Sequence, residues 1–167
     1  MPQKQFDEKL DELTQRLLTM SHRVEELVDA AVALAVREDG DDPASVREGD
    51  QEIDEAEVAI EENCIELLAL HQPMATDLRH IVTILKINND LERIGDHAVN
   101  VANAVDRLRK IGEFPPIPPE LEEMSRLSRE MLRDALDAFV RRADDEARDV
   151  MARDDRVDSL HESVFRI

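Results

Sequence analysis

Two segments of the sequence place acidic side chains four residues apart, close enough in a helix to bind the same ion. Asp50 and Asp54 form the first pair, and Glu92 and Asp96 form the second. In a helix the two members of each pair lie one above the other on the same face. Two like charges at this spacing cost a helix roughly a few tenths of a kcal/mol. A bound cation would supply the missing positive charge, so the spacing points to metal chemistry.

The first pair belongs to a longer acidic stripe. Its members follow one another at intervals of four, three and four residues: Asp50, Asp54, Glu57 and Glu61. Arg47, Arg79 and Arg93 lie near in sequence and could neutralise only part of this charge. A cluster rich in oxygen and free of thiols suits hard or borderline metals such as Mg²⁺, Mn²⁺ or iron.

A related group recurs near the C-terminal end of the sequence, where Asp154, Asp158 and His161 share one helical face. Two carboxylates and an imidazole are also a reasonable ligand set for a helical bundle. A simpler interpretation competes with both sites. In a chain with 40 acidic residues, such spacings arise by chance, and runs of charge usually mark a solvated face. The residues alone leave both interpretations open.

Apolar residues at helical spacing predict three long helices before residue 112. The first helix has an apolar residue at every third or fourth position: Phe6, Leu10, Leu13, Leu17, Met20, Val24, Leu27, Ala31 and Leu34. The second helix is expected from Ser45 to about Leu70. The third is expected to run to about Lys110 with Thr76 as its N-cap. Its predicted apolar seam is Ile84, Ile87, Leu91, Ile94, Ala98, Val101, Val105 and Leu108.

Three long helices with short turns predict an antiparallel three-helix bundle and an all-α fold. On the predicted seam, Glu92 and Asp96 point away from the core. The second and third helices are neighbours in such a bundle, so the two acidic segments can face the same side. The elements therefore place the first acidic pair opposite the second.

The chain then begins again after a proline-rich linker. Moving the sequence by 104 residues places Leu17 on Leu121, Val46 on Val150 and Asp50 on Asp154. We expect tandem three-helix bundles, with the first repeat at 1–112, a linker at 113–119 and a second repeat at 120–167. The second bundle is incomplete on this alignment, because it contains the first helix and about half of the second. We therefore expect the sequence to stop short of the natural protein, and the apolar face of the second unit to be covered by a neighbouring chain or left exposed. We also expect a homo-oligomer, with a homodimer as the expected form.

Composition narrows the possible functions. The 21 basic and 40 acidic residues give a net charge of −19, which disfavours binding to nucleic acid or to a bare anionic membrane. The single Cys64 excludes an intrachain disulfide. No apolar run is long enough for a signal peptide core or a membrane span, so we expect a cytoplasmic protein without direct membrane insertion. The sequence has no Ser-His-Asp spacing, glycine-rich phosphate loop, CxxC or HExxH motif, and this disfavours an enzyme.

Two segments resemble the PhoU family closely. In the stretch 48–102, DLR at 77–79 and DLERIGD at 90–96 follow the DxxxD formed by Asp50 and Asp54. The stretch FVRRADDEARDVMARDDRVDSLHE at 139–162 resembles the same family. The resemblance covers essentially the whole chain. It implies tandem three-helix bundles whose E/D-xxx-D motifs hold multinuclear clusters of iron or zinc, with Mg²⁺ also possible.

The resemblance also implies which residues bind metal and what the protein does. The first cluster would use Asp50 and Asp54 with Glu92 and Asp96. The second would use Asp154 and Asp158, and its partner motif falls beyond residue 167. The implied function is a non-enzymatic regulator that links the phosphate ABC transporter to a sensor histidine kinase and represses the phosphate regulon when phosphate is plentiful. A metal-storing or metal-dependent hydrolytic bundle is the alternative, since clustered carboxylates can activate water.

Overall fold

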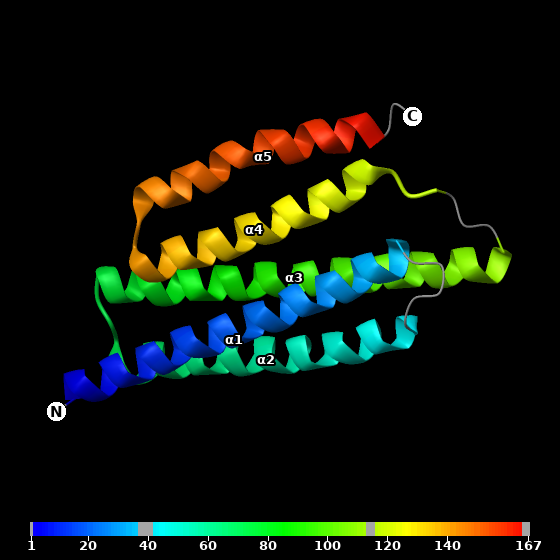
Figure 1. Ribbon diagram of the computed structural model, residues 1–167. Coiled ribbons are helices and arrows are strands. Elements are labelled where there is room, and N and C mark those ends of the chain that lie inside the picture. The colour runs from blue at the N-terminus through cyan, green and yellow to red at the C-terminus, as the bar shows by residue number, and fades with distance from the viewer. Residues whose placement is uncertain (1, 37–41, 113–115, 165–167) are drawn as a thin grey trace. The chain divides into compact units, whose positions relative to one another are not determined.

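The computed structural model describes residues 2–36, 42–112 and 116–164, and these residues are almost entirely helical. The described helices are α1 (Pro2–Val36), α2 (Pro43–His71), α3 (Thr76–Ile111), α4 (Pro119–Arg141) and α5 (Asp144–Val164) (Figure 1). The chain divides into two compact units, Met1–Gly112 and Glu113–Ile167. The predicted all-α fold is confirmed.

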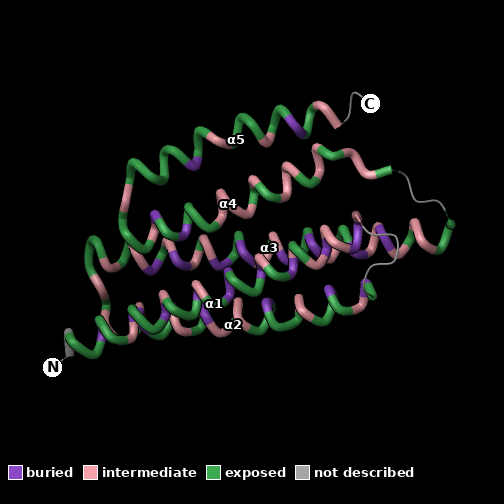
Figure 2. Tube along the Cα trace, in the orientation of Figure 1, coloured by how far each residue is buried: buried purple, intermediate pink, exposed green. Residues whose placement is uncertain are grey.

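The first unit is an antiparallel bundle in which each of α1, α2 and α3 contacts the other two. Helix α1 supplies the most regular part of its core. All nine apolar positions predicted for this helix are buried: Phe6, Leu10, Leu13, Leu17, Met20, Val24, Leu27, Ala31 and Leu34. They form a continuous stripe because three- and four-residue steps keep successive side chains on one face. Figure 2 shows the buried positions recurring along all three helices of this unit.

The ends of α2 use backbone and side-chain caps that the sequence encodes. Asp42 is the N-cap, and its carboxylate accepts a hydrogen bond of 2.9 Å from the backbone N–H of Ala44. Pro43 occupies the first helical position, where its missing N–H costs no helical hydrogen bond. Gln72 ends the helix in the left-handed region, with φ of 45°. These features start and stop α2 close to the predicted bounds.

The start of α3 differs from the predicted cap. Thr76 was expected to be the N-cap, but it is the first residue of the helix, and Ala75 holds the N-cap position without a side-chain cap bond. The turn is tight: the N–H of Asp77 donates to the carbonyl of Met74 over 3.2 Å, and Ala75 has φ of 47°. Backbone hydrogen bonds of the turn thus replace the expected threonine cap.

The buried seam of α3 also differs from the predicted one. Ile84, Leu91, Ala98 and Val105 are buried as expected, but Val101 is exposed. The observed seam steps regularly by three and four residues: Ile81, Ile84, Asn88, Leu91, Gly95, Ala98, Ala102 and Val105. The prediction failed because it followed apolar residues alone. Two of the buried seam positions are the polar Asn88 and Gly95, which has no side chain. That omission moved the expected seam toward Ile87, Ile94 and Val101.

The second unit contains the antiparallel helices α4 and α5, which contact each other. Ion pairs between described residues join them: Arg153 to Asp134 at 2.6 Å, Arg156 to Glu123 at 2.8 Å and Arg141 to Glu146 at 2.7 Å. In the predicted linker at 113–119, residues 113–115 lie outside the described residues, and α4 begins at Pro119. The expectation that a neighbouring chain covers the apolar face of this pair, or that the face is left exposed, stays a prediction.

A core substitution in α1 tests the packing of the first unit. Leu17→Ala should lower the free energy of unfolding by about 2–5 kcal/mol, because it leaves a cavity at a fully buried position. Leu70→Ala is the matched control, since Leu70 is largely exposed, and it should change stability by less than about 0.5 kcal/mol. Urea unfolding followed by circular dichroism measures both. Equal losses in the two variants would contradict this core.

Candidate metal centre

Two contacts set the register between α2 and α3. The side-chain amide of Asn88 donates a hydrogen bond of 3.0 Å to the backbone carbonyl of Glu57. Two turns further along α3, a Cβ built on Gly95 would lie 2.7 Å from Oδ1 of Asp50. Asp50 and Glu57 are seven residues apart on α2, as are Asn88 and Gly95 on α3. Both contacts therefore define one antiparallel alignment of the two helices.

Gly95 is what lets a carboxylate enter this helix interface. Real side chains show essentially no contact as short as 2.7 Å at Cβ, and Ile53 Cδ1 would lie only 3.4 Å from the same atom. Any larger residue at position 95 would have to displace Asp50 from the surface of α3. The glycine costs α3 about 1 kcal/mol in helix propensity relative to alanine. It permits a close approach at the centre of the candidate site.

The alignment gathers acidic side chains from both helices on one side of the bundle. We call this set the acidic cluster: Asp50, Asp54, Glu57, Glu61, Glu92 and Asp96. Burial, reinforced by the charges of Asp54, Asp96 and Glu92, raises the pKa of Asp50 to about 6. Burial also raises the pKa of Glu92, with further contributions from Asp96 and Asp54. The two predicted pairs thus interact electrostatically across the interface.

The acidic cluster extends beyond the four acids of the two E/D-xxx-D motifs. Burial raises the pKa of Glu57, and Glu61, Glu92 and Asp54 raise it further. Glu57 and Glu92 are half-buried rather than fully solvated. The expectation that Glu92 points away from the core is therefore only partly right, because Glu92 adjoins the buried positions Leu91 and Gly95.

Among the described residues, no basic side chain forms an ion pair with a member of the acidic cluster. Arg93 pairs with Asp90 at 3.3 Å and only weakly offsets the raised pKa of Glu92. Arg47 donates instead to the side-chain carbonyl of Asn103 over 3.1 Å. The chain itself therefore provides little of the positive charge that the cluster lacks.

The oxygen donors fit a hard or borderline cation in type and charge. Their placement is looser than in a closed site: within the described residues, no three side chains of Asp, Glu, His or Cys converge on a common metal position. The carboxylates would have to turn toward one another to share an ion. Metal binding at Asp50, Asp54, Glu92 and Asp96 therefore stays a prediction that the donor chemistry supports.

Comparison with known proteins identifies the family. The model of the protein family described as "PhoU domain" matches residues 17–105 and 121–167 of this chain. The chain belongs to the PhoU family. The two PhoU matches begin at residues 17 and 121, an offset that agrees with the internal alignment of the sequence by 104 residues. The residues that carried the resemblance, including Asp50, Asp54, Glu92 and Asp96, lie inside the first match.

Curated relatives and solved PhoU structures cover nearly all of the chain. A Clostridium acetobutylicum protein named "Phosphate-specific transport system accessory protein PhoU homolog" is 39% identical over 99% of this chain and 75% of its own length. The Escherichia coli protein PhoU is 36% identical over 97% of this chain and 67% of its own. The crystal structure of PhoU from Pseudomonas aeruginosa superposes with a TM-score of 0.88 at 37% identity, covering 96% of this chain and 77% of that one.

The second predicted site lies on α5. Asp154, Asp158 and His161 occupy one face of this helix and are all exposed. In the first PhoU repeat the matching residues of α2 are Asp50, Asp54 and Glu57, which face acids of α3. Among the described residues of the second unit, no third helix provides a counterpart of the α3 acids. Metal binding by Asp154, Asp158 and His161 stays a prediction.

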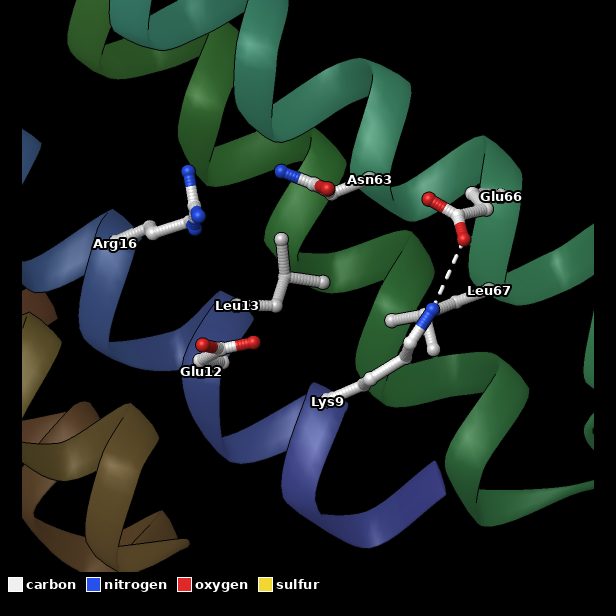
Figure 3. Close-up of a pocket in the computed structure, with 7 residues that line it drawn as sticks. All are labelled: Lys9, Glu12, Leu13, Arg16, Asn63, Glu66 and Leu67. Atoms are coloured by element: carbon white, nitrogen blue, oxygen red, sulfur yellow. Dashed lines mark hydrogen bonds and ion pairs between the residues drawn. The ribbon is translucent and has the colours of Figure 1, made fainter. Parts of the chain in front are cut away.

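A pocket between α1 and α2 is a different candidate site (Figure 3). It has a volume of about 140 Å³ and is lined by Lys9, Glu12, Leu13, Arg16, Asn63, Glu66 and Leu67. Lys9 and Glu66 point toward each other and form an ion pair of 2.9 Å. Its lining mixes both signs of charge and lies on the α1 side of α2, whereas the acidic cluster faces α3. It adds no ligand to the predicted metal centre.

The raised pKa of Asp50 predicts how stability depends on pH in metal-free protein. Between about pH 4 and pH 6 the folded protein keeps a proton on Asp50 that the unfolded chain has lost. The free energy of unfolding should therefore fall as the pH rises through this window. Asp50→Asn should flatten that fall, whereas Asp11→Asn, at an exposed position on α1, should not. Urea unfolding at several pH values in the presence of chelator measures this, and identical profiles for parent and Asp50→Asn would contradict the coupling.

Proposed function

We propose that this protein is a non-enzymatic accessory regulator of phosphate uptake. The observation that carries the proposal is the PhoU domain match over residues 17–105 and 121–167. Relatives that it resembles over nearly its whole length are named phosphate-specific transport system accessory proteins. A similar solved structure, at 32% identity and a TM-score of 0.85, is titled phosphate transport system regulatory protein PhoU from Streptococcus pneumoniae.

In this proposal the protein links the phosphate ABC transporter to a sensor histidine kinase and represses phosphate-starvation genes when phosphate is plentiful. The family resemblance supports this role, and so does a sequence without a recognisable catalytic motif. The chain spans 64–75% of the length of the first three curated relatives, so the role of the longer relatives is carried over here as part of the proposal. We place the protein in the cytoplasm, where both partners would be reached. Among the described helices, each lacks the length or the apolar character needed to cross a bilayer.

We also propose that the acidic cluster binds iron or zinc, with Mg²⁺ as a further candidate. Three observations support this proposal: the donors are all oxygen, Gly95 admits Asp50 to the helix interface, and burial, reinforced by mutual repulsion, raises the pKa of Asp50 and Glu92. A cation would relieve that repulsion. Clustered negative charge opposes the close packing of α2 against α3. In an accessory protein, the bound cation would neutralise part of this charge and so stabilise the packing of the two helices.

Deletion of the gene tests the regulatory role. Because a repressor acts when phosphate is abundant, its loss should raise expression of a phosphate-starvation reporter in phosphate-rich medium to a level near that of starved cells. Reporter assays with and without phosphate measure this, with a plasmid copy of the gene as the control. The repurified protein should show no phosphatase turnover. Unchanged reporter expression after deletion would exclude the regulatory role, and hydrolysis that survives repurification would favour an enzyme.

Amide substitutions test the metal proposal. The variant carries Asp50→Asn, Asp54→Asn, Glu92→Gln and Asp96→Asn, which preserve size and helix pattern but remove charge. Added Fe²⁺ or Zn²⁺ should raise the melting temperature of the parent, because a ligand that binds only the folded state stabilises it. The variant should not respond. Without metal it should be as stable as the parent or slightly more so, since each like-charge pair costs roughly a few tenths of a kcal/mol.

A charge-matched control separates this site from the general acidity of the chain. Neutralising four acids elsewhere should leave the metal response intact: Asp11→Asn, Glu12→Gln, Asp144→Asn and Asp145→Asn. Differential scanning fluorimetry with chelator, Fe²⁺, Zn²⁺ and Mg²⁺ compares the three proteins. A parent whose melting temperature ignores every metal would mean that the acidic cluster is only a surface.

A further inference from the structure

Exposed large apolar side chains gather at the turn between α2 and α3. Of the ten in the described residues, six lie between residues 58 and 82. Met74 in the turn is 80% exposed, and Ile65 on α2 is 55% exposed. Leu78 and Val82, near the start of α3, are exposed as well. Single exposed apolar residues are ordinary, but a group of them on one face marks a contact surface.

Four of these residues lie toward the turn on the side of the bundle that carries the acidic cluster, and Val58 lies further along the same side. We call them the hairpin patch: Ile65, Met74, Leu78 and Val82. On α2, steps of four, three and four residues lead from Asp54 through Val58 and Glu61 to Ile65. The Glu57–Asn88 register, continued by two turns, brings Ile65 level with the stretch from Leu78 to Val82. The patch is therefore continuous across both helices.

Leu70 does not belong to this surface, although it is strongly exposed. It follows Glu66 by four residues and so lies on the same side of α2 as Glu66. That side faces α1, because Glu66 pairs with Lys9. Leu70 thus provides a matched exposed leucine on the same helix but off the patch.

Charges of opposite sign border the hairpin patch. On α2 the outer edge carries Glu55 and Glu62, which are seven residues apart. On α3 the outer edge carries Arg79, Lys86 and Arg93, again at intervals of seven. Among the described residues, Arg79 and Lys86 form no ion pair. An apolar centre between an acidic and a basic edge is the arrangement by which helices in coiled coils select partner and orientation.

We propose that the hairpin patch docks an amphipathic helix of a protein partner. The apolar stripe of that helix would cover Ile65, Leu78 and Val82. Its basic side chains would lie beside the acidic edge of α2, and its acidic side chains beside the basic edge of α3. This inference rests on the proposed accessory function, because a protein that links others needs a surface on which one of them docks.

A second copy of the chain fits this surface less well. If two copies paired through their patches about a two-fold axis parallel to the helices, the two acidic clusters would face each other across the interface. Pairing the copies about an axis across the helices would place the acidic edge of one α2 against the acidic edge of the other. Either arrangement sets like charges against each other at the interface. Charge therefore favours a different protein as the occupant.

A synthetic helical peptide tests the surface directly. It carries leucine at its a and d positions, lysine along one flank and glutamate along the other, and its binding to the full chain is followed by fluorescence anisotropy. Ile65→Ser combined with Val82→Ser should weaken binding by about tenfold or more, since apolar anchors dominate such contacts. Leu70→Ser should leave the affinity unchanged. Circular dichroism of each variant verifies that the fold is retained, as expected for exposed positions.

A charge-reversal cycle tests the orientation of the flanks. Arg79→Glu with Lys86→Glu should weaken binding of this peptide. A second peptide with lysine on both flanks should bind that variant more tightly than the change in net charge alone explains. Arg107→Glu with Arg148→Glu alters the net charge equally at exposed positions off the patch, and it should show no such coupling. Equal coupling in both variants would overturn the proposed charge arrangement.

The remaining outcomes also decide the matter. A parent chain that does not bind the peptide, or patch variants that bind as the parent does, would overturn the proposal. Self-association that is lost in Ile65→Ser would show that a second copy is the occupant instead. Normal binding combined with an unresponsive phosphate reporter would refute the accessory function and leave the surface standing. Lost peptide binding with a normal reporter in the patch variants would show that no partner needed for regulation docks on this surface, and would overturn the proposal while leaving the accessory function standing.

Discussion

The close approach of α2 and α3 at Gly95 is the constraint on which the rest of this face depends. A backbone without a side chain at that position lets the carboxylate of Asp50 lie against α3. Two turns away, the hydrogen bond from Asn88 to the carbonyl of Glu57 holds the same alignment. A shift of either helix by one turn would separate the two acidic pairs and also break up the apolar patch near the turn. The candidate metal centre and the proposed docking surface thus depend on one register.

This register carries an energetic cost. The side chain of Asn88 is buried, and among the described residues its Oδ1 has no hydrogen-bond partner. Leaving a buried polar atom unsatisfied costs about 1–3 kcal/mol. An apolar residue would pack at position 88 without that cost, but it would tolerate neighbouring alignments equally well. A single buried asparagine at a seam position is a known way to select one register at the expense of stability. Here the selected register is the one that places Asp50 and Asp54 across the interface from Glu92 and Asp96.

Apolar spacing was enough to predict α1, because each of its seam positions holds an aliphatic or aromatic residue. It failed on α3, where Asn88 and Gly95 occupy seam positions and carry no apolar signal. The positions of the acids followed from their spacing and from the family resemblance. The burial that raises the pKa of Asp50 and Glu92 did not, because it depends on how closely two helices distant in sequence approach each other. Helical spacing alone leaves Ile65 and Val82 off the core stripes. It could not show that the two residues lie level with each other, because this also depends on how α2 and α3 are aligned.

The acidic cluster and the hairpin patch share one face, so a change of charge in one must be felt by the other. Without a cation, the cluster adds strong negative potential beside the apolar centre and favours a partner with basic side chains near it. With a cation bound, that potential falls, and the same partner would lose part of its attraction. Coupling of this kind is reciprocal: a partner that prefers one charge state must shift cation affinity by the same factor. The physical link is the shared α2–α3 surface and needs no movement of the bundle, because electrostatic interactions at partly buried sites act over several ångströms.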